Sequence, residues 1–362
     1  MLVIAGVLAV LAAGFAVYLL GGSGNGTPTA GPTPDGTPTF TLPSTSASAP
    51  DTSSAEAPSA DLIAAGALRC PTGGVIVSTS GGLTSALAGA RPGSVIRLLP
   101  GTYHGNFVAK VAGTAVRPVF VCGPSTAVLD GGDTNNGYGL YLNRASYWRI
   151  VGLTVQDSQK GVVLDGVTHA VLQGLTVQNV GDEGIHLRRA STYNVVVGNI
   201  VRYTGLHKAK FGEGIYIGTA VKNWCTYSNC VADRSDHNVI AYNTVSATGA
   251  ESVDVKEGTT GGVIRNNHFS SGPMTTGATS WVNVKGNNYL VSANVGVDGP
   301  LNGFSTHVIV DGWGQNNTFV GNVARVNSSG YGFDITGHVP NRVACNNVVS
   351  AAGAGFSNVG CS

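Results

Sequence analysis

The sequence predicts an all-β fold, a parallel β-helix in which short strands stack coil upon coil into a solenoid. Strand-like apolar segments recur about once per two dozen residues from Tyr147 onward, which is a typical solenoid period. The 53 glycines among 362 residues have no collagen period, so turns must be frequent. Asparagines also recur at one position of the repeat, where stacked side chains would form an amide ladder inside the turns: Asn199, Asn243, Asn267, Asn294, Asn322 and Asn347.

Each coil is predicted to contain two strands. The first is represented by Val171–Val177 and the second by Ser252–Lys256, where apolar and polar residues alternate as in a half-buried strand. The second strands are centred on residues 163, 186, 216, 254, 283, 309, 334 and 357. A short helix from Ser80 to Ala90, with a serine as candidate N-cap, is expected to cover the N-terminal end of the solenoid.

The chain divides into three regions. Residues 1–20 are almost entirely apolar and long enough to cross a bilayer, which predicts a transmembrane signal-anchor or a signal peptide. Residues 21–60 consist mainly of Gly, Thr, Pro, Ser and Ala and are expected to be a disordered linker. Residues 61–362 form the predicted β-helix domain. The protein is therefore expected to be secreted or held at the cell surface, with membrane contact only through its N-terminal segment.

Cysteine content and charge set further limits. Six cysteines in an exported chain indicate disulfides, and their spacing favours Cys70–Cys122, Cys225–Cys230 and Cys345–Cys361. A net charge of +1 gives no electrostatic case for binding nucleic acid. The domain is expected to be monomeric.

Departures from the repeat point to a site in the middle coils. Four insertions interrupt the regular spacing, at residues 207–212, 219–236, 271–280 and 296–305. Insertions in solenoids often form the walls of a binding face. We therefore expect the site on the outward face of the second strands. Two columns of side chains cross that face, one with His186, Tyr216, Asp254 and Asn283, the other with Arg188, Lys256, Lys285 and Asp311.

Stacked like charges suggest two kinds of chemistry. Glu183, Glu213 and Glu251 occupy one position of the repeat, and carboxylates at strand spacing repel one another unless a cation lies among them. Oxygen ligands suit Ca²⁺, although solvated glutamates or turn caps would explain them equally. Lys256 beside Lys285 would lower the pKa of one amine toward that of a general base. The alternative is two solvated lysines, or salt bridges to neighbouring carboxylates.

Two segments resemble the chondroitinase B and alginate lyase family of polysaccharide lyases, which have the right-handed, pectin-lyase-like β-helix. They are Arg91–Tyr103 with Gly113–Gly123, and Glu251-Ser-Val-Asp-Val-Lys256. In that family calcium neutralises the uronate carboxylate, a lysine takes the C5 proton and an arginine assists. The resemblance implies a base role for Lys256 and a calcium-ligand role for Glu251.

These observations favour an extracytoplasmic enzyme that cleaves a uronate-containing polysaccharide by β-elimination. The candidate catalytic residues are Lys256, Lys285, Arg188, Asp254 and His307. The candidate substrate-binding residues are His186, Tyr216, Trp281, Asn283 and Asp311, and the candidate metal ligands are Glu213, Glu251 and Glu183. Two alternatives remain open: a β-helix glycoside hydrolase that uses Asp254 with Asp311 or Glu257, and a non-catalytic glycan-binding surface protein.

Overall fold

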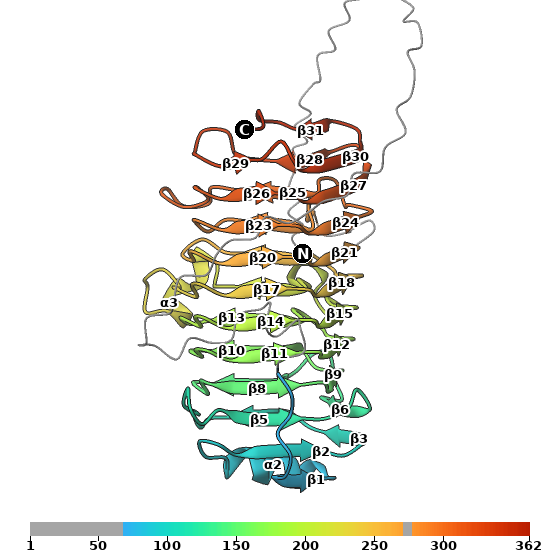
Figure 1. Cartoon of the computed structure of the whole chain (residues 1–362), viewed down its shortest axis with the longest axis vertical. Helices are drawn as coiled ribbons and strands as arrows, with labels where there is room; N and C mark the ends of the chain where they lie inside the picture. The colour runs from blue at the N-terminus through green and yellow to red at the C-terminus, as the bar shows by residue number, and fades with distance from the viewer. Residues whose placement is uncertain (1–67, 271–276) are drawn as a thin grey trace, which may run out of the picture. The chain divides into compact units, whose positions relative to one another are not determined.

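A computed structural model describes residues 68–270 and 277–362 of the chain, and it has the predicted parallel β-helix architecture (Figure 1). Three parallel sheets run the length of the stack, and we call them sheets A, B and C. Sheet A contains β1 (Val75–Val77), β2 (Val95–Leu98), β5 (Val119–Cys122), β8 (Trp148–Val151), β11 (Val171–Gln173), β14 (Val195–Val197), β17 (Val239–Ala241), β20 (Val263–Arg265), β23 (Leu290–Ser292), β26 (Thr318–Val320) and β29 (Arg342–Val343).

Sheet B contains β3 (Gly101–His104), β6 (Ala127–Asp130), β9 (Thr154–Gln156), β12 (Thr176–Gln178), β15 (Ile200–Arg202), β18 (Thr244–Ser246), β21 (His268–Ser270), β24 (Val295–Val297), β27 (Val323–Ser328) and β30 (Val348–Ala352). Sheet C contains β4 (Phe107–Ala109), β7 (Tyr138–Asn143), β10 (Lys160–Asp165), β13 (Ile185–Arg188), β16 (Ile215–Ile217), β19 (Val253–Val255), β22 (Val282–Val284), β25 (Phe304–Thr306), β28 (Tyr331–Asp334) and β31 (Gly355–Ser357).

Each complete coil has three strands, so the prediction of two strands per coil was wrong. The segment that we predicted as one strand, Val171–Val177, forms β11 and β12, which a turn at Gly174 separates. Gly174 has φ +64°, a left-handed conformation that an extended strand cannot contain. The alternation of apolar residues continues through this turn, and the pattern alone therefore reads as a single strand.

The predicted asparagine ladder is present at these turns. Along the ladder, each side-chain nitrogen donates to the side-chain oxygen of the asparagine one coil further on, at 2.9–3.0 Å from Asn199 to Asn347. The same nitrogens also donate to backbone carbonyls, for example from Asn243 to Val196 at 2.9 Å. Because every one of these buried amides is paired, the ladder fixes the register of successive coils without a desolvation penalty.

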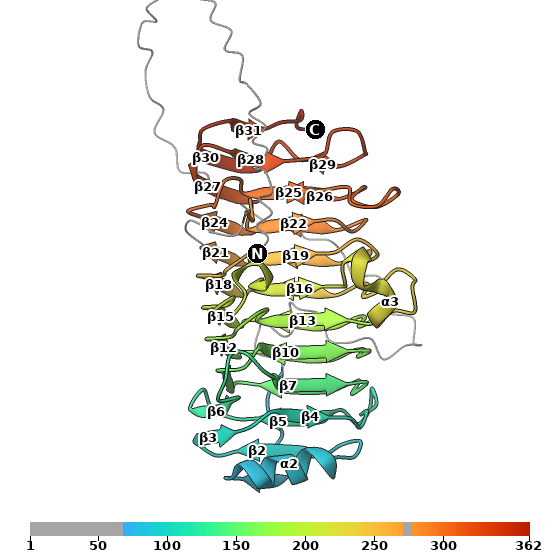
Figure 2. The same ribbon diagram turned by 180° about the vertical axis from the view of Figure 1, so that it is seen from behind.

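The N-terminal helix is α2 (Ser80–Ala88), which lies beside β2 at the N-terminal end of the stack (Figure 2). Thr79 is its N-cap and accepts from the Gly82 amide, so the serine cap that we predicted was wrong by one residue. Leu83 and Leu87 are buried in the same apolar core as the first strands. Burying these two leucines stabilises the end of the core that would otherwise face water.

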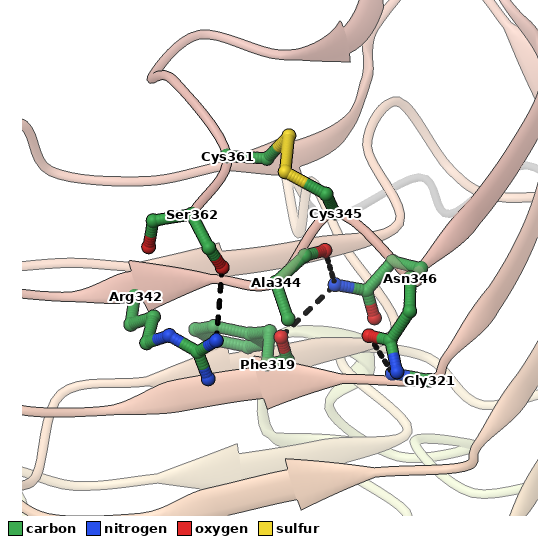
Figure 3. The surroundings of a disulfide bond; sticks show 9 residues. Phe319, Gly321, Arg342, Ala344, Cys345, Asn346, Cys361 and Ser362 are labelled. Carbon is green, nitrogen blue, oxygen red and sulfur yellow. Dashed lines mark hydrogen bonds between the residues drawn. A yellow bond between two sulfur atoms is a disulfide. The ribbon is translucent and has the colours of Figure 1, made fainter.

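All three predicted disulfides are present, joining Cys70 to Cys122, Cys225 to Cys230 and Cys345 to Cys361. Figure 3 shows the last of them at the final coil, where the Arg342 guanidinium also donates to the carbonyl of Ser362 at 2.9 Å. A bridge between residues 16 positions apart contributes roughly 3 kcal/mol in the chain-entropy account.

The predictions for residues 1–20 and 21–60, a membrane segment and a linker, fall outside the described residues. Within residues 68–270 and 277–362, no helix is long and apolar enough to cross a membrane.

One strand of sheet C lies elsewhere than predicted. We placed the sixth strand at residues 307–311, but β25 is Phe304–Thr306, and Ser305 is the residue that pairs with Asn283. His307 directly follows β25 and stands beside Lys285. Asp311 lies in an exposed turn beyond the strand, outside the columns of sheet C.

Candidate active site

A cleft of about 660 Å³ lies over the middle strands of sheet C. Its floor consists of outward side chains of β7 to β16, and Lys256, which follows β19, lies at its end. One wall is the insertion that contains η1 (Ala209–Phe211). The other is the cysteine-containing insertion, which carries η2 (Val221–Asn223) and α3 (Trp224–Tyr227), the latter seen beside β16 in Figure 2. Two of the four predicted insertions, residues 207–212 and 219–236, therefore wall the predicted face, whereas residues 296–305 do not line the cleft.

The cleft is strongly basic. Three carboxylates line it, whereas six cationic side chains do so: Lys160, Arg188, Lys208, Lys210, Lys222 and Lys256. The whole chain has a net charge of only +1, so cationic side chains are concentrated in this cleft. Such a surplus attracts a polyanion and raises its rate of association.

Strand pairing brings most of the predicted residues together. One row across sheet C contains His186, Tyr216, Asp254 and Asn283, which are paired residue by residue from β13 to β22. The residues two positions later along the chain form a second row, which contains Arg188, Gly218, Lys256, Lys285 and His307.

Asp254 lies between the two lysines. Its carboxylate oxygens are each 2.5 Å from an ammonium nitrogen, Oδ2 from Lys256 and Oδ1 from Lys285. Burial alone would raise the pKa of Asp254, but the two lysines lower it below its usual value. Asp254 is 1% exposed, so its charge depends on both partners.

The pKa that we predicted for Lys256 was wrong in direction. Burial favours the neutral amine, yet Asp254, Tyr216 and Glu213 together outweigh burial and raise the pKa of Lys256 above its usual value. Repulsion by Lys285 and salt bridges to neighbouring carboxylates were both left open by the sequence, and the structure has the salt bridges. That repulsion is relieved because Asp254 is placed between the two ammonium groups.

Tyr216 lies against Lys256 on the floor of the cleft. The Lys256 nitrogen is 4.8 Å from the centre of the Tyr216 ring, and His186 contacts the same ring edge-to-face at 4.5 Å. Burial raises the pKa of Tyr216 well above its usual value, although Lys256 opposes that effect. Tyr216 is therefore a phenol at neutral pH, next to the ammonium group of Lys256.

The two histidines take different positions. His186 is buried, its Nε2 is 3.0 Å from the carbonyl oxygen of Gly218, and burial lowers its pKa well below the usual value. Nδ1 of His307 lies 2.8 Å from Oδ1 of Asn283. The side-chain nitrogen of Asn283 donates to Glu251 at 3.0 Å. His186 lines the cleft and His307 extends the polar row beyond it.

The predicted glutamates separate into two groups. Glu213, Glu251 and Asp254 offer oxygens within 4.8 Å of one another, whereas Glu183 forms an ion pair with Lys160. Burial raises the pKa of Glu213 well above its usual value, and Asp254 and Glu183 raise it further. The Oε2 atom of Glu213 is buried and has no hydrogen-bond partner among the described residues.

These carboxylates fit a proton better than they fit Ca²⁺. Calcium takes about six to eight oxygen ligands. Here both oxygens of Asp254 already contact ammonium groups, which would also repel a nearby dication. A proton on Glu213 relieves the same repulsion without further ligands.

Three predicted substrate-binding residues do not line the cleft, namely Trp281, Asn283 and Asp311. Trp281 is fully buried in the core, with its ring 5.9 Å from that of Phe304, so a role on the binding face is wrong. Asp311 is exposed in the turn after β25 and does not line the cleft.

The sequence analysis did not identify several side chains that line the cleft, namely Tyr138, Lys160, Lys208, Lys210, Lys222 and Tyr227. The last four lie in two of the insertions that we had located by spacing. A count of cationic residues inside those insertions would have identified three of them.

Comparison with known proteins supports the same architecture. The family model described as a right handed beta helix region matches residues 125–236. No curated protein sequence matches the chain. A pectate lyase structure is 16% identical, with a TM-score of 0.57 over 76% of this chain and 72% of that one. A surface adhesin of Streptococcus pneumoniae is 11% identical, with a TM-score of 0.51 over 74% and 78% of the two chains. Both share the fold.

A much nearer relative among solved structures is an alginate lyase from Paenibacillus sp. str. FPU-7. It is 34% identical, with a TM-score of 0.73, and the match covers 78% of this chain and 97% of that one. A sequence identity of 34% over nearly the whole of that chain indicates a family relationship, not only a shared fold. The chain therefore belongs to the family of polysaccharide-active, right-handed parallel β-helix proteins that includes the Paenibacillus alginate lyase.

Proposed function

We propose that this protein is a secreted lyase that cleaves a uronate polymer such as alginate by β-elimination. The observation that carries the proposal is the contact of Lys256 with Tyr216 at the floor of a basic cleft. The relationship to an alginate lyase supports it. Three disulfides agree with an exported protein, and we propose that the domain acts as a monomer.

The chemistry assigns one proton transfer to each of the two groups. Lys256, as the free amine, takes the proton from C5 of a uronate unit, and the C5–H electrons form the C4=C5 double bond. The C4–O4 bond breaks, and Tyr216 as a phenol gives its proton to the leaving oxygen. The cations around the cleft compensate the carboxylate of the reacting unit, which makes its C5 proton more acidic.

The raised pKa of Lys256 predicts the pH dependence of this reaction. Only the free amine is a base, and Asp254 holds Lys256 as an ammonium ion, so activity should increase with pH. We expect kcat/KM to be still rising at about pH 9, because an ordinary lysine loses its proton near 10.4. Initial rates between neutral and alkaline pH, on protein whose circular dichroism is unchanged, measure this. A rate that is already constant from neutral pH upward would contradict the assignment of Lys256 as base.

The carboxylate cluster gives a separate prediction about stability. The folded-state pKa of Glu213 is raised, so folding takes up a proton there, and stability should fall as pH rises above about 4.5 until the folded-state pKa is passed. Glu213→Gln removes this loss and should raise Tm at pH 8 by about 2–4 °C. Near pH 4 the variant and the unmodified protein should have the same Tm.

Bound calcium would give the opposite result. If Glu213 and Glu251 held Ca²⁺, Glu213→Gln would lower Tm, and EDTA would lower the Tm of the unmodified protein, because a native-state ligand stabilises by mass action. Melting curves with EDTA and with added Ca²⁺ separate the two accounts.

The alternative functions have less support. A hydrolase needs two available carboxyl groups, but Asp254 is bound between two lysines and Oε1 of Glu257 accepts from the Val221 amide at 2.6 Å. A passive glycan-binding face loses one of its predicted aromatic rings, because Trp281 is in the core. Incubation with alginate and detection of an unsaturated product test the lyase assignment directly.

A further inference from the structure

We propose that Arg188, with Tyr138 and Tyr227, forms a second anion subsite in the cleft, which binds the carboxylate of a uronate unit beside the one that reacts. The proposal rests on the proposed function for the identity of the polymer, but it does not depend on the β-elimination step. It also gives a role to the Cys225–Cys230 insertion, which carries Tyr227.

The geometry around Arg188 is that of a prearranged binding group. Its Nε and Nη2 atoms donate to Oδ2 of Asp165 at 3.2 and 3.0 Å. The guanidinium carbon lies 4.4 Å from the centre of the Tyr227 ring and 5.6 Å from that of Tyr138. Arg188 is only 4% exposed, yet it lines the cleft. A guanidinium fixed in this way loses little freedom when it binds a carboxylate.

The local charge is not balanced. Nε of Arg189 lies 3.1 Å from Oδ1 of Asp165, so two guanidinium groups share a single carboxylate. The Arg189 side chain is 41% exposed and its charge is solvated, so the charge that is only partly compensated inside the protein is that of Arg188. Such a charge is costly unless an anion pairs with it. The carboxylate of a uronate has the charge and the two-oxygen geometry that match a guanidinium.

The subsite lies on the path of the polymer. Arg188 and Lys256 belong to the same row of sheet C, two strands apart, which is roughly 10 Å. Gly218 stands between them and has no side chain, so nothing rises from the floor at that point. A Cβ atom there would lie 2.6 Å from Cγ2 of Thr259. A chain that lies along the cleft can therefore reach both residues.

Hydrogen bonds attach the cysteine insertion to the chain directly after Arg188, and this attachment holds Tyr227 in place. Its Asp233 accepts from the backbone amides of Arg189 and Ala190, both at 2.9 Å, and from Thr219 at 2.6 Å. These bonds fix the insertion to the two residues that follow Arg188. Tyr227 is thus a positioning residue: it acts on the substrate through Arg188.

Binding measurements in a Lys256→Met background, where turnover does not consume the ligand, test the subsite. The probe is a series of mannuronate oligomers of increasing length, titrated by calorimetry. Tyr227→Ala should weaken binding of the longer oligomers about tenfold, the effect of losing one desolvated cation–aromatic contact. The shortest oligomers, which occupy only one of the two sites, should show a much smaller loss. Equal affinity of Tyr227→Ala and its parent at every length would overturn the proposal.

A matched control is available outside the cleft. Arg202 lies 5.5 Å from the Tyr203 ring, the same kind of pair, but on sheet B. Tyr203→Ala should leave oligomer affinity unchanged, and a loss equal to that of Tyr227→Ala would overturn the assignment. Arg188→Lys keeps the charge without the forked donor, and it should also lose about tenfold on long oligomers. If oligomers bind with this pattern but the protein with Lys256 intact forms no unsaturated product from alginate, the subsite stands and the lyase assignment fails.

Discussion

Lys256→Met should lower turnover on a uronate polymer by about two to four orders of magnitude, the usual contribution of a general base. Methionine keeps most of the length of the side chain and removes the amine, so the proton on C5 loses its acceptor. The change also takes one of two ammonium partners from buried Asp254, which should cost about 1.5–3 kcal/mol of stability. Steady-state kinetics must therefore be measured well below the Tm of the variant. A folded variant with near-full turnover would eliminate this mechanism.

Lys285→Met is the matched control for that experiment. It removes the other ammonium partner of the same carboxylate, so its stability should fall by a similar amount. Lys285 does not line the cleft, so its loss should affect turnover far less than the loss of Lys256. If both variants lose turnover equally, the defect of Lys256→Met comes from Asp254 and not from a missing base.

Tyr216→Phe should lower kcat by about two to four orders of magnitude with little change in KM, because the leaving oxygen loses its proton donor. The hydroxyl makes no hydrogen bond to another described residue, and phenylalanine keeps the ring contacts with His186 and Lys256. The fold should therefore be unaffected. Initial rates over a range of substrate concentrations separate kcat from KM. A large rise in KM with unchanged kcat would make Tyr216 a binding residue, as the sequence first indicated.

Tyr203→Phe provides the control for loss of a tyrosine hydroxyl. Tyr203 is 47% exposed and follows β15 on sheet B, so neither constant should change. A comparable fall in kcat would show that the assay responds to something other than the cleft.

The fold was predictable because its strongest determinants are local and periodic. Each asparagine of the ladder bonds to its equivalent one coil away, so one residue type recurs at one position and is visible in the sequence. Insertions were visible for the same reason, since they interrupt a fixed spacing. The three predicted disulfides each join one cysteine to the next along the chain, which is the pairing that spacing favours.

Other features depend on compensation between distant residues. Trp281 occupies a core position where neighbouring coils have small residues, Ser252 and Gly303. Its ring fits because residue 296 of sheet B is glycine, and a Cβ there would lie 2.3 Å from the ring. The tryptophan and the small residues that make room for its ring lie in different coils. No single coil therefore shows the compensation, and the tryptophan was assigned to the surface.

The prediction of where β25 lies was wrong for a related reason. Residues 307–311 alternate as a strand should, yet the strand begins at Phe304 after Gly303, and Phe304 pairs with Phe333, which follows Gly332. Aligning these Gly–Phe pairs would have placed it. The raised pKa of Lys256 agrees with the alternative of salt bridges to neighbouring carboxylates, but the pattern alone could not show that Asp254 contacts both lysines.

The central claim is that the basic cleft over sheet C performs β-elimination on a uronate polymer. The most direct test incubates the purified protein with alginate and counts two quantities, the new reducing ends and the C4=C5 double bonds conjugated with a carboxylate, which absorb in the near ultraviolet. We predict one double bond for each new reducing end, and neither product with Lys256→Met above a small residual rate. New reducing ends without the double bond would contradict the claim.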